Sequence, residues 1–151
     1  MKLILMRHGQ AEAYQASDNT RQLTEFGYQQ AEQTAQYIMD KYQPSMFVVS
    51  PYDRAQQTLT AFTQLAPDIE VSVHADITPA DDAMSALNNL ADVQGECVLV
   101  VCHMPIVAKL AALVTGSTPE SYALAEARVF DMPFIAADMG DEIDRFVPKQ
   151  P

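Results

Sequence analysis

The chain has 151 residues, enough for one domain with a sizeable buried core, and we expect a single domain over residues 1–151. Its formal net charge of −11 at pH 7 argues against binding to nucleic acid or to an anionic membrane surface. No apolar run approaches the about 20 residues that cross a bilayer, and no secretory segment is recognisable, so we expect a cytoplasmic protein.

Apolar runs rich in β-branched residues predict six strands along the chain. The runs are 2–6, 46–50, 70–74, 97–103, 125–132 and 143–147. Cys97 and Cys102 both lie in the fourth run, where their separation in a strand is roughly 16 Å. The Cα atoms of a disulfide lie about 4.4–6.8 Å apart, so we expect two reduced, buried thiols.

Helical features separate the first four of these strands. Thr24 is expected to N-cap a helix that runs to about Tyr42. Its apolar stripe consists of Tyr28, Ala31, Ala35, Ile38 and Met39. Further helix starts are expected at Ser50–Pro51, Thr78–Pro79, Pro105 (for a helix over 105–114) and Thr118–Pro119 (a short helix or turn).

The alternation of strands and helices predicts the fold class. Right-handed crossovers bring such strands into a mostly parallel sheet with helices on both faces, so we expect an α/β protein with a three-layer α/β/α sandwich. The last two strands are joined through a region containing Gly140 and are expected to form an antiparallel edge. The tail from Pro148 is expected to be frayed.

The most informative pattern is Arg7-His8-Gly9, which follows the first predicted strand. In open α/β sheets ligands bind at the carboxyl ends of the strands. Arginine offers a planar fork of donors that matches phosphate or carboxylate, and glycine lets the backbone approach a ligand. Taken alone, the tripeptide is also compatible with a surface salt bridge of Arg7 and a structural role for His8.

Three further residues lie where this tripeptide predicts partners. Arg21 precedes the first long helix, Arg54 lies in the helix start after the second strand, and His103 ends the fourth strand. Arg54 is poorly placed for the helix dipole, which favours acids there, and such local inconsistencies are typical of functional sites. If the strands are neighbours, these side chains converge on an anion site. His74 has no arginine or other motif residue near it in the sequence, and it is interpreted as structural or exposed.

Four segments combine these residues into a larger pattern. They are Leu5-Met6-Arg7-His8-Gly9; Arg21 with Leu23-Thr24 and Gly27; Ser50-Pro51 with Arg54-Ala55 and Gln57-Thr58; and Val101-Cys102-His103-Met104-Pro105. In combination they resemble the histidine phosphatase (phosphoglycerate mutase-like) superfamily. The shortness of the chain and the segment from Ala16 to Thr24 resemble the small bacterial phosphohistidine phosphatases of the SixA type. The resemblance implies a phosphoglycerate mutase-like fold and a phosphatase activity.

The resemblance also implies roles for the conspicuous residues. His8 would be the nucleophile, forming a phosphohistidine intermediate that water hydrolyses. Arg7, Arg21 and Arg54 would bind the phosphoryl oxygens, and His103, protonated while phosphate is bound, would complete the site. No acidic metal-binding cluster accompanies these residues in the sequence, so we expect a metal-independent reaction without a cofactor.

The proton donor departs from the family pattern. Larger members carry a glutamate after the third strand, whereas residues 75–82 contain none. Asp18, in the polar loop before the first long helix, is the expected substitute, although a solvated turn explains it equally well. Asp76, Asp81 and Asp82 are the alternatives, and the start of a helix accounts for the last two.

The absence of this glutamate favours a phosphohistidine substrate. A phosphorylated imidazole leaves as neutral imidazole once its ring is protonated, whereas an alkoxide needs a strong acid. We therefore expect a phosphohistidine phosphatase acting on a protein, such as a phosphotransfer domain of a signalling relay or a carrier protein of sugar uptake. A small-molecule phosphomonoester phosphatase is the alternative; a mutase and a catalytically silent phosphoprotein-binding module are less favoured. We expect a monomer.

Overall fold

A computed structural model describes residues 1–14 and 16–151. The strands in these residues are β1 (Lys2–Arg7), β2 (Met46–Val49), β3 (Val71–Val73), β4 (Cys97–Cys102), β5 (Ala127–Asp131) and β6 (Asp141–Phe146). The helices are α1 (Glu25–Lys41), α2 (Asp53–Leu65), α3 (Ala83–Leu90) and α4 (Ile106–Thr115), with a short 3-10 helix, η1, at Asp18–Thr20. The predicted strands are confirmed to within two residues at each end. None of the described helices is long and apolar enough to cross a membrane.

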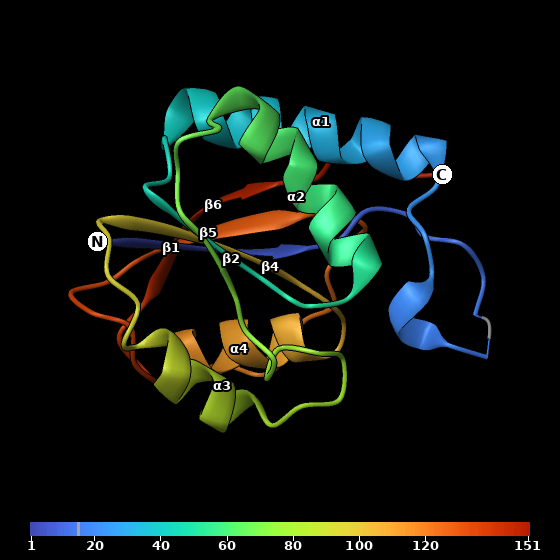
Figure 1. Ribbon diagram of the computed structural model, residues 1–151. Helices are drawn as coiled ribbons and strands as arrows, with labels where there is room; N and C mark the ends of the chain where they lie inside the picture. The colour runs from blue at the N-terminus through green and yellow to red at the C-terminus, as the bar shows by residue number, and fades with distance from the viewer. Residues whose placement is uncertain (15) are drawn as a thin grey trace.

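The strands form one mixed sheet in the order β3-β2-β4-β1-β5-β6. The first four strands of that order run parallel, whereas β5 pairs antiparallel with β1 and β6 pairs antiparallel with β5. Helices α1 and α2 cover one face of the sheet, and α3 and α4 cover the other (Figure 1). The predicted three-layer α/β/α sandwich with an antiparallel edge is therefore confirmed.

Alternate residues of β1 face opposite helix layers, as expected for a strand that is buried on both faces. Leu3 and Leu5 pack into the core that includes residues of α3 and α4, whereas Ile4 and Met6 pack into the core that includes residues of α1 and α2. All four side chains are completely buried. The continuous apolar run in the sequence therefore reflects a central strand with helices on both sides.

The carboxyl ends of β1, β2 and β4 meet at one edge of the sheet. Arg7 lies in register with Cys102 across the β1–β4 pair, and Val49 lies in register with Val101 across the β2–β4 pair. Since all three strands run parallel, the residues that follow them lie side by side at this edge. The fold thus places three chain segments, distant in sequence, around one site.

Three predicted helix starts are wrong. Helix α2 begins at Asp53 instead of Pro51, α3 begins at Ala83 instead of Pro79, and no helix follows Thr118. The serine and threonine before the two prolines do not cap helices, because their hydroxyl groups lie against other side chains. The residue type that caps a helix is present in each case, but the Ser50 hydroxyl bonds to His103 at a neighbouring strand end, and the Thr78 hydroxyl bonds to Asp81 within its own loop.

Helix α1 largely follows its prediction. Thr24 caps it, with the hydroxyl oxygen accepting a hydrogen bond from the amide three residues on (3.0 Å). The predicted apolar stripe is partly wrong, because Tyr28 is exposed while Gln30 and Thr34 are buried. The Thr34 hydroxyl donates to the Ala125 carbonyl oxygen (2.8 Å), so its burial leaves no unsatisfied donor.

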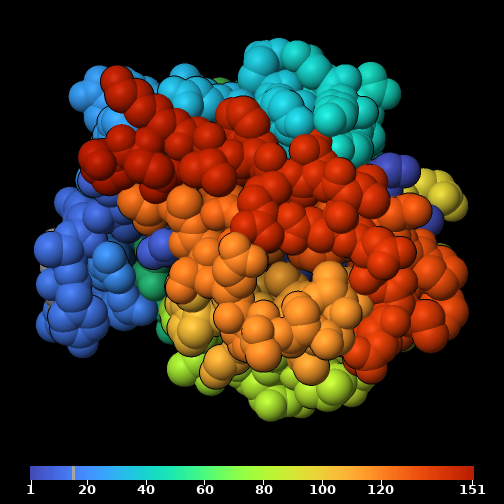
Figure 2. Space-filling model, turned by 180° about the vertical axis from the view of Figure 1, so that it is seen from behind, coloured from blue at the N-terminus to red at the C-terminus, as the bar shows by residue number. Residues whose placement is uncertain are grey.

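The tail from Pro148 is held against α1, so the prediction of a frayed end is wrong. The Gln30 side chain donates to the Lys149 carbonyl oxygen, and the Lys149 amide donates to the Gln33 side chain, both at 3.0 Å. In Figure 2 the red C-terminal segment runs beside the light-blue residues of α1. The burial of Gln30 in α1 is thus explained in part by its contact with the end of the chain.

Candidate active site

Four of the predicted functional residues converge at the carboxyl edge of the sheet. Arg7 ends β1 and His8 follows it, Arg54 lies in the first turn of α2, and His103 directly follows β4. The ring centroids of His8 and His103 are 5.2 Å apart, and Arg54 Nε lies 3.3 Å from His8 Nε2. The parallel strands therefore bring both histidines and two arginines into one cluster.

His8 is held as a neutral ring whose Nε2 lone pair is available. Its Nδ1 lies 2.6 Å from the Gly9 carbonyl oxygen, which can only accept a hydrogen bond, so Nδ1 carries the proton. Nε2 then accepts the hydrogen bond from Arg54 Nε. Burial and three neighbouring arginines lower the pKa of His8 to about 3, against the opposing effect of the Gly9 contact. At neutral pH this imidazole is unprotonated, which is the form that can act as a nucleophile.

Close backbone packing fixes the loop that carries His8. The Gly9 amide donates to Thr58 Oγ1 in α2 (3.1 Å). A Cβ atom on Gly9 would lie 2.5 Å from the carbonyl oxygen of Gly27 in α1, and one on Gly27 would collide with the Gln10 carbonyl oxygen. Only glycine at both positions allows the two backbones to approach in this way, which holds the loop of His8 against α1 and α2.

The arginines beside His8 present donors toward the cluster. Arg54 is only 3% exposed and donates from Nη1 to the Asp18 carbonyl oxygen (2.7 Å). Arg7 donates from Nη1 to the Tyr122 carbonyl oxygen (2.8 Å), while its buried Nε has no partner in residues 1–14 and 16–151. Burial lowers the pKa of both guanidinium groups, which nevertheless stay charged at neutral pH. Such a buried cationic cluster suits an anion with several oxygens.

Asp18 links the third arginine to this cluster. Arg21 Nη1 donates to Asp18 Oδ1 (3.0 Å), and Arg54 Nη2 donates to Asp18 Oδ2 (3.2 Å). Partial burial raises the pKa of this carboxyl, but the hydrogen bonds and charges of the two arginines outweigh it, so the pKa is lowered overall. Without a bound anion, Asp18 is an ionised carboxylate between two arginines.

The other predicted candidates have local contacts. Asp82 caps α3 through the Ser85 amide, Asp81 accepts hydrogen bonds from Thr78, and Asp76 accepts one from Asn89. His74 follows β3, and its amide donates to the Val49 carbonyl oxygen. In the described part of the chain, none of these four side chains contacts the cluster around His8. This agrees with the interpretation of His74 as structural or exposed.

His103 is completely buried and neutral. Its Nε2 lies 2.7 Å from Ser50 Oγ, and its Nδ1 has no partner among the described residues. Burial, followed by the charges of the neighbouring ionisable groups, lowers the pKa of His103 to about 2. The ring is therefore unprotonated when no phosphate is bound.

Three residues of the site were missed in the sequence. Ser50 was interpreted as a helix cap, although its position directly after a strand beside that of His103 could have revealed it. The Tyr52 ring lies 5.1 Å from the His103 ring, with the Arg54 guanidinium 5.2 Å from its centroid. Tyr122, whose carbonyl oxygen holds Arg7, lies in an irregular segment that offers no sequence signal.

Comparisons with known proteins agree with this geometry. The family model of the histidine phosphatase superfamily (branch 1) matches residues 3–78. The chain is 33% identical over 129 residues to the phosphohistidine phosphatase SixA homolog of Haemophilus influenzae, covering 77% of this chain and 78% of that protein. It is 34% identical over 128 residues to the phosphohistidine phosphatase SixA of Escherichia coli (strain K12), covering 81% of this chain and 80% of that protein.

The chain belongs to the histidine phosphatase superfamily. A solved structure of the protein histidine phosphatase SixA complexed with tungstate matches it with a TM-score of 0.84 at 27% identity, over 98% of this chain and 97% of that one. The predicted family and the predicted phosphoglycerate mutase-like architecture are therefore confirmed, and the family supports a phosphatase activity.

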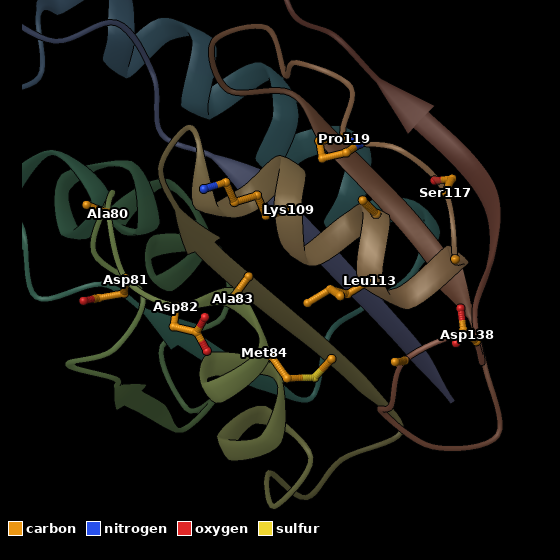
Figure 3. Close-up of a pocket in the computed structure, with 13 residues that line it drawn as sticks. Ala80, Asp81, Asp82, Ala83, Met84, Lys109, Leu113, Ser117, Pro119 and Asp138 are labelled. Atoms are coloured by element: carbon orange, nitrogen blue, oxygen red, sulfur yellow. The ribbon is translucent and has the colours of Figure 1, made fainter.

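This histidine phosphatase also has a cavity of about 700 Å³ between α3 and α4 (Figure 3). Met84 of α3 and Lys109 and Leu113 of α4 are among the residues that line it. None of the histidines or arginines around His8 lines this cavity. The cluster around His8 therefore lies outside it, at the carboxyl edge of the sheet, whereas the alternative proton donors Asp81 and Asp82 line the cavity. In the described residues, no three His, Cys, Asp or Glu side chains are grouped to hold a metal ion.

The two buried histidines predict a loss of stability in mild acid. In the folded histidine phosphatase their pKa values are lowered to about 3 for His8 and about 2 for His103, whereas unfolded histidine takes up a proton near pH 6.5. The unfolded state therefore binds more protons as the pH falls below about 6.5. The free energy of unfolding is expected to fall by up to about 1.4 kcal/mol per pH unit for each histidine.

Denaturant unfolding in phosphate-free buffer from pH 7.5 to 4.5 checks this expectation. His103→Ala should reduce the slope of unfolding free energy against pH by about half, since one of two buried histidines is removed. The matched control is His74→Ala, which should leave the slope unchanged. A wild-type slope near zero across this range would contradict the prediction.

Proposed function

We propose that this histidine phosphatase removes phosphate from phosphohistidine side chains of other proteins through a covalent intermediate on His8. The observation that carries the proposal is the neutral His8 ring, whose Nε2 lies 3.3 Å from Arg54 Nε in a buried arginine cluster. A nucleophile that is unprotonated at neutral pH and faces guanidinium donors suits attack on a phosphoryl group. The relatives named phosphohistidine phosphatases support this choice of substrate.

In the first proposed step, His8 Nε2 attacks phosphorus, so that a new N–P bond forms while the N–P bond of the substrate breaks. The substrate imidazole takes a proton and leaves as a neutral ring. Arg7, Arg21 and Arg54 bind the phosphoryl oxygens and stabilise the charge spread over them in the transition state. Three guanidinium groups can supply the positive charge that this step needs, and we propose that no metal takes part.

In the second proposed step, water attacks the phosphorus of phosphorylated His8. The N–P bond breaks, Nε2 regains its lone pair, and inorganic phosphate leaves. The proton lost by the attacking water passes to the Asp18 carboxylate, which was formed when the protonated Asp18 carboxyl group gave its proton to the substrate imidazole in the first step. The cycle then returns the neutral His8 ring to its contact with Gly9.

Asp18 is the residue that we propose for this proton transfer. Its carboxylate shares Arg21 and Arg54 with the expected phosphate, and it is about one-third exposed at the mouth of the cluster. Its pKa is lowered in the phosphate-free site, because the two arginines outweigh partial burial. A bound phosphoryl dianion would compete for these arginines and raise the carboxyl pKa by like-charge repulsion.

Asp18→Asn is expected to affect two substrate classes unequally. Turnover of an alkyl phosphomonoester should fall about 10²-fold or more, because its alkoxide needs an acid, whereas turnover of a phosphohistidine protein should fall roughly tenfold or less. Steady-state kinetics on both substrates measure the difference. Asp76→Asn, whose contact with Asn89 is local, is the matched control and should change neither rate. Equal or absent losses would contradict a donor role for Asp18.

The proposed substrate class is tested with a panel of proteins labelled with ³²P on histidine. Phosphotransfer domains and sugar-uptake carrier proteins are incubated with the enzyme, loss of label is followed, and glycerol phosphate is hydrolysed in parallel. We expect kcat/KM for at least one phosphohistidine protein to exceed that for glycerol phosphate. The opposite ranking across the panel would favour the phosphomonoester phosphatase, which can use the same cluster, and no turnover of any substrate would favour a binding module.

A further inference from the structure

We propose that Ser50 is a positioning residue for His103: its hydroxyl donates to His103 Nε2 and fixes the tautomer in which Nδ1–H serves as a hydrogen-bond donor to the phosphoryl group. The inference deepens the proposed function and rests on it for the identity of the acceptor. It assigns a role to a serine that sequence patterns place at a helix start. It also replaces the imidazolium expected at His103 with a neutral donor.

The contacts of Ser50 Oγ determine the direction of its hydrogen bond. Ser50 is completely buried, and its oxygen accepts a hydrogen bond from the Tyr52 amide at 3.2 Å. The other described contact of this oxygen is His103 Nε2, at 2.7 Å. Because an amide can only donate, the single hydroxyl proton of Ser50 has Nε2 as its acceptor.

The opposite arrangement leaves a buried donor without an acceptor. If His103 Nε2 carried the proton, it would donate to Ser50 Oγ, and the Ser50 hydroxyl proton would have no acceptor among the described residues. A buried polar group without a partner costs about 1–3 kcal/mol. Nδ1 of His103 has no partner among the described residues in either tautomer, so a protonated Nε2 leaves two buried groups unpartnered and a protonated Nδ1 leaves one. The geometry therefore favours the tautomer with a bare Nε2 and a protonated Nδ1.

This tautomer explains the unpartnered Nδ1 of His103. Nδ1 is buried and has no acceptor in the described part of the chain. The ring lies 5.2 Å from the ring of His8, beside the arginine cluster that suits a phosphoryl group. A phosphoryl oxygen bound there would satisfy the Nδ1–H donor. The lowered pKa of His103 agrees with this, since a neutral ring carries a proton on only one nitrogen and Nδ1 can donate in only one of the two tautomers.

The first test measures the tautomer directly and needs no substrate. Long-range ¹H–¹⁵N NMR spectra of ¹⁵N-histidine-labelled protein, without phosphate, distinguish a protonated Nδ1 from a protonated Nε2. We expect wild-type His103 to be protonated on Nδ1, and Ser50→Ala to shift the population toward Nε2. A wild-type ring protonated on Nε2 would overturn the proposal, even if the phosphatase activity is as proposed.

The second test separates positioning from general stability. Ser50→Ala is expected to lower the rate of His8 phosphorylation about 10–100-fold, the range for partners that orient a functional histidine. Ser50→Thr, which keeps the hydroxyl, should restore most of the rate. Ser45→Ala removes a hydroxyl that bonds to the Cys97 carbonyl oxygen at the opposite end of β2, and it should leave the rate unchanged.

Two outcomes of the second test would overturn the role of Ser50. One is a Ser50→Ala rate equal to that of Ser45→Ala, and the other is failure of Ser50→Thr to exceed Ser50→Ala while the protein stays folded. If Ser50→Ala does not fold, the wild-type NMR spectrum alone decides. Loss of phosphatase activity in every variant and the wild type would refute the proposed function and leave the NMR result unaffected.

Discussion

Replacing His8 with alanine is expected to lower phosphatase turnover by about 10⁴-fold or more and to abolish the covalent phosphoenzyme. The physical reason is that Nε2 of the neutral ring is the atom placed to form the new N–P bond, while Nδ1 is occupied by the Gly9 carbonyl oxygen. The measurement is a trapping experiment: the enzyme is incubated with a ³²P-labelled phosphodonor, quenched in base, and tested for protein-bound label that acid releases.

The matched control for this variant is His74→Ala. His74 lies after β3 at the far edge of the sheet order, and its described contact is a backbone hydrogen bond to Val49. Its loss should leave both labelling and turnover at the wild-type level. Acid-labile label that persists in His8→Ala would show that another group is the nucleophile. Turnover without any trapped label in the wild type would favour direct attack by water.

Arg54→Lys is expected to lower kcat/KM by about 10²–10³-fold, although the positive charge is kept. Arg54 is the one cation whose described contacts join His8 to Asp18, since it donates both to His8 Nε2 and to the Asp18 carboxylate. Lysine replaces the planar fork of guanidinium donors with a single ammonium group. With a phosphoryl group bound, that ammonium group cannot serve both the His8 side and the Asp18 side of the site. Steady-state kinetics on a phosphohistidine protein measure the loss.

The control for Arg54→Lys is Arg145→Lys. Arg145 takes part in a partly exposed network with Glu120 and Glu142 on the antiparallel side of the sheet, so its conservative replacement should leave kcat/KM unchanged. Inorganic phosphate should also bind Arg54→Lys more weakly than the wild type, which separates a binding defect from a fold defect. A wild-type value of kcat/KM in Arg54→Lys would contradict the assignment of Arg54 to the phosphoryl site.

Much of the fold follows from local patterns. The strand over Leu3–Met6 is predictable because a strand buried on both faces must be apolar at every position. Thr24 is predictable as a cap because its hydroxyl needs only the amide three residues on. Ser50 follows the same local rule and yet fails, since its partner lies 53 residues away in sequence. A capping propensity describes which hydrogen bonds a side chain can make locally. It does not describe which partners from distant segments will compete for that side chain.

The candidate site also has features that the sequence predicts and features that only the tertiary structure shows. The positions of His8 and His103 are predictable because each directly follows a strand, and that of Arg54 because it lies in the start of the helix after β2. Ligands of open α/β sheets bind at this carboxyl edge of the parallel strands. The pairing of Asp18 with Arg21 and Arg54 is not predictable, because it depends on how a polar loop folds back over α2. Sequence reasoning therefore identified Asp18 as a candidate and could not give its protonation state.

By itself, the sequence determined the α/β layering and the residues that gather at one sheet edge, because these depend on periodicity and on residue types at fixed places relative to strand ends. The family was indicated by the resemblance of its four motif segments and shown by the comparisons. Only the tertiary structure decided that His8 presents Nε2, that Ser50 faces His103, and that the tail packs on α1. Hydrogen bonds between distant segments have strict limits of distance and angle. These limits are met only when the packed sheet has fixed the relative positions of its strands.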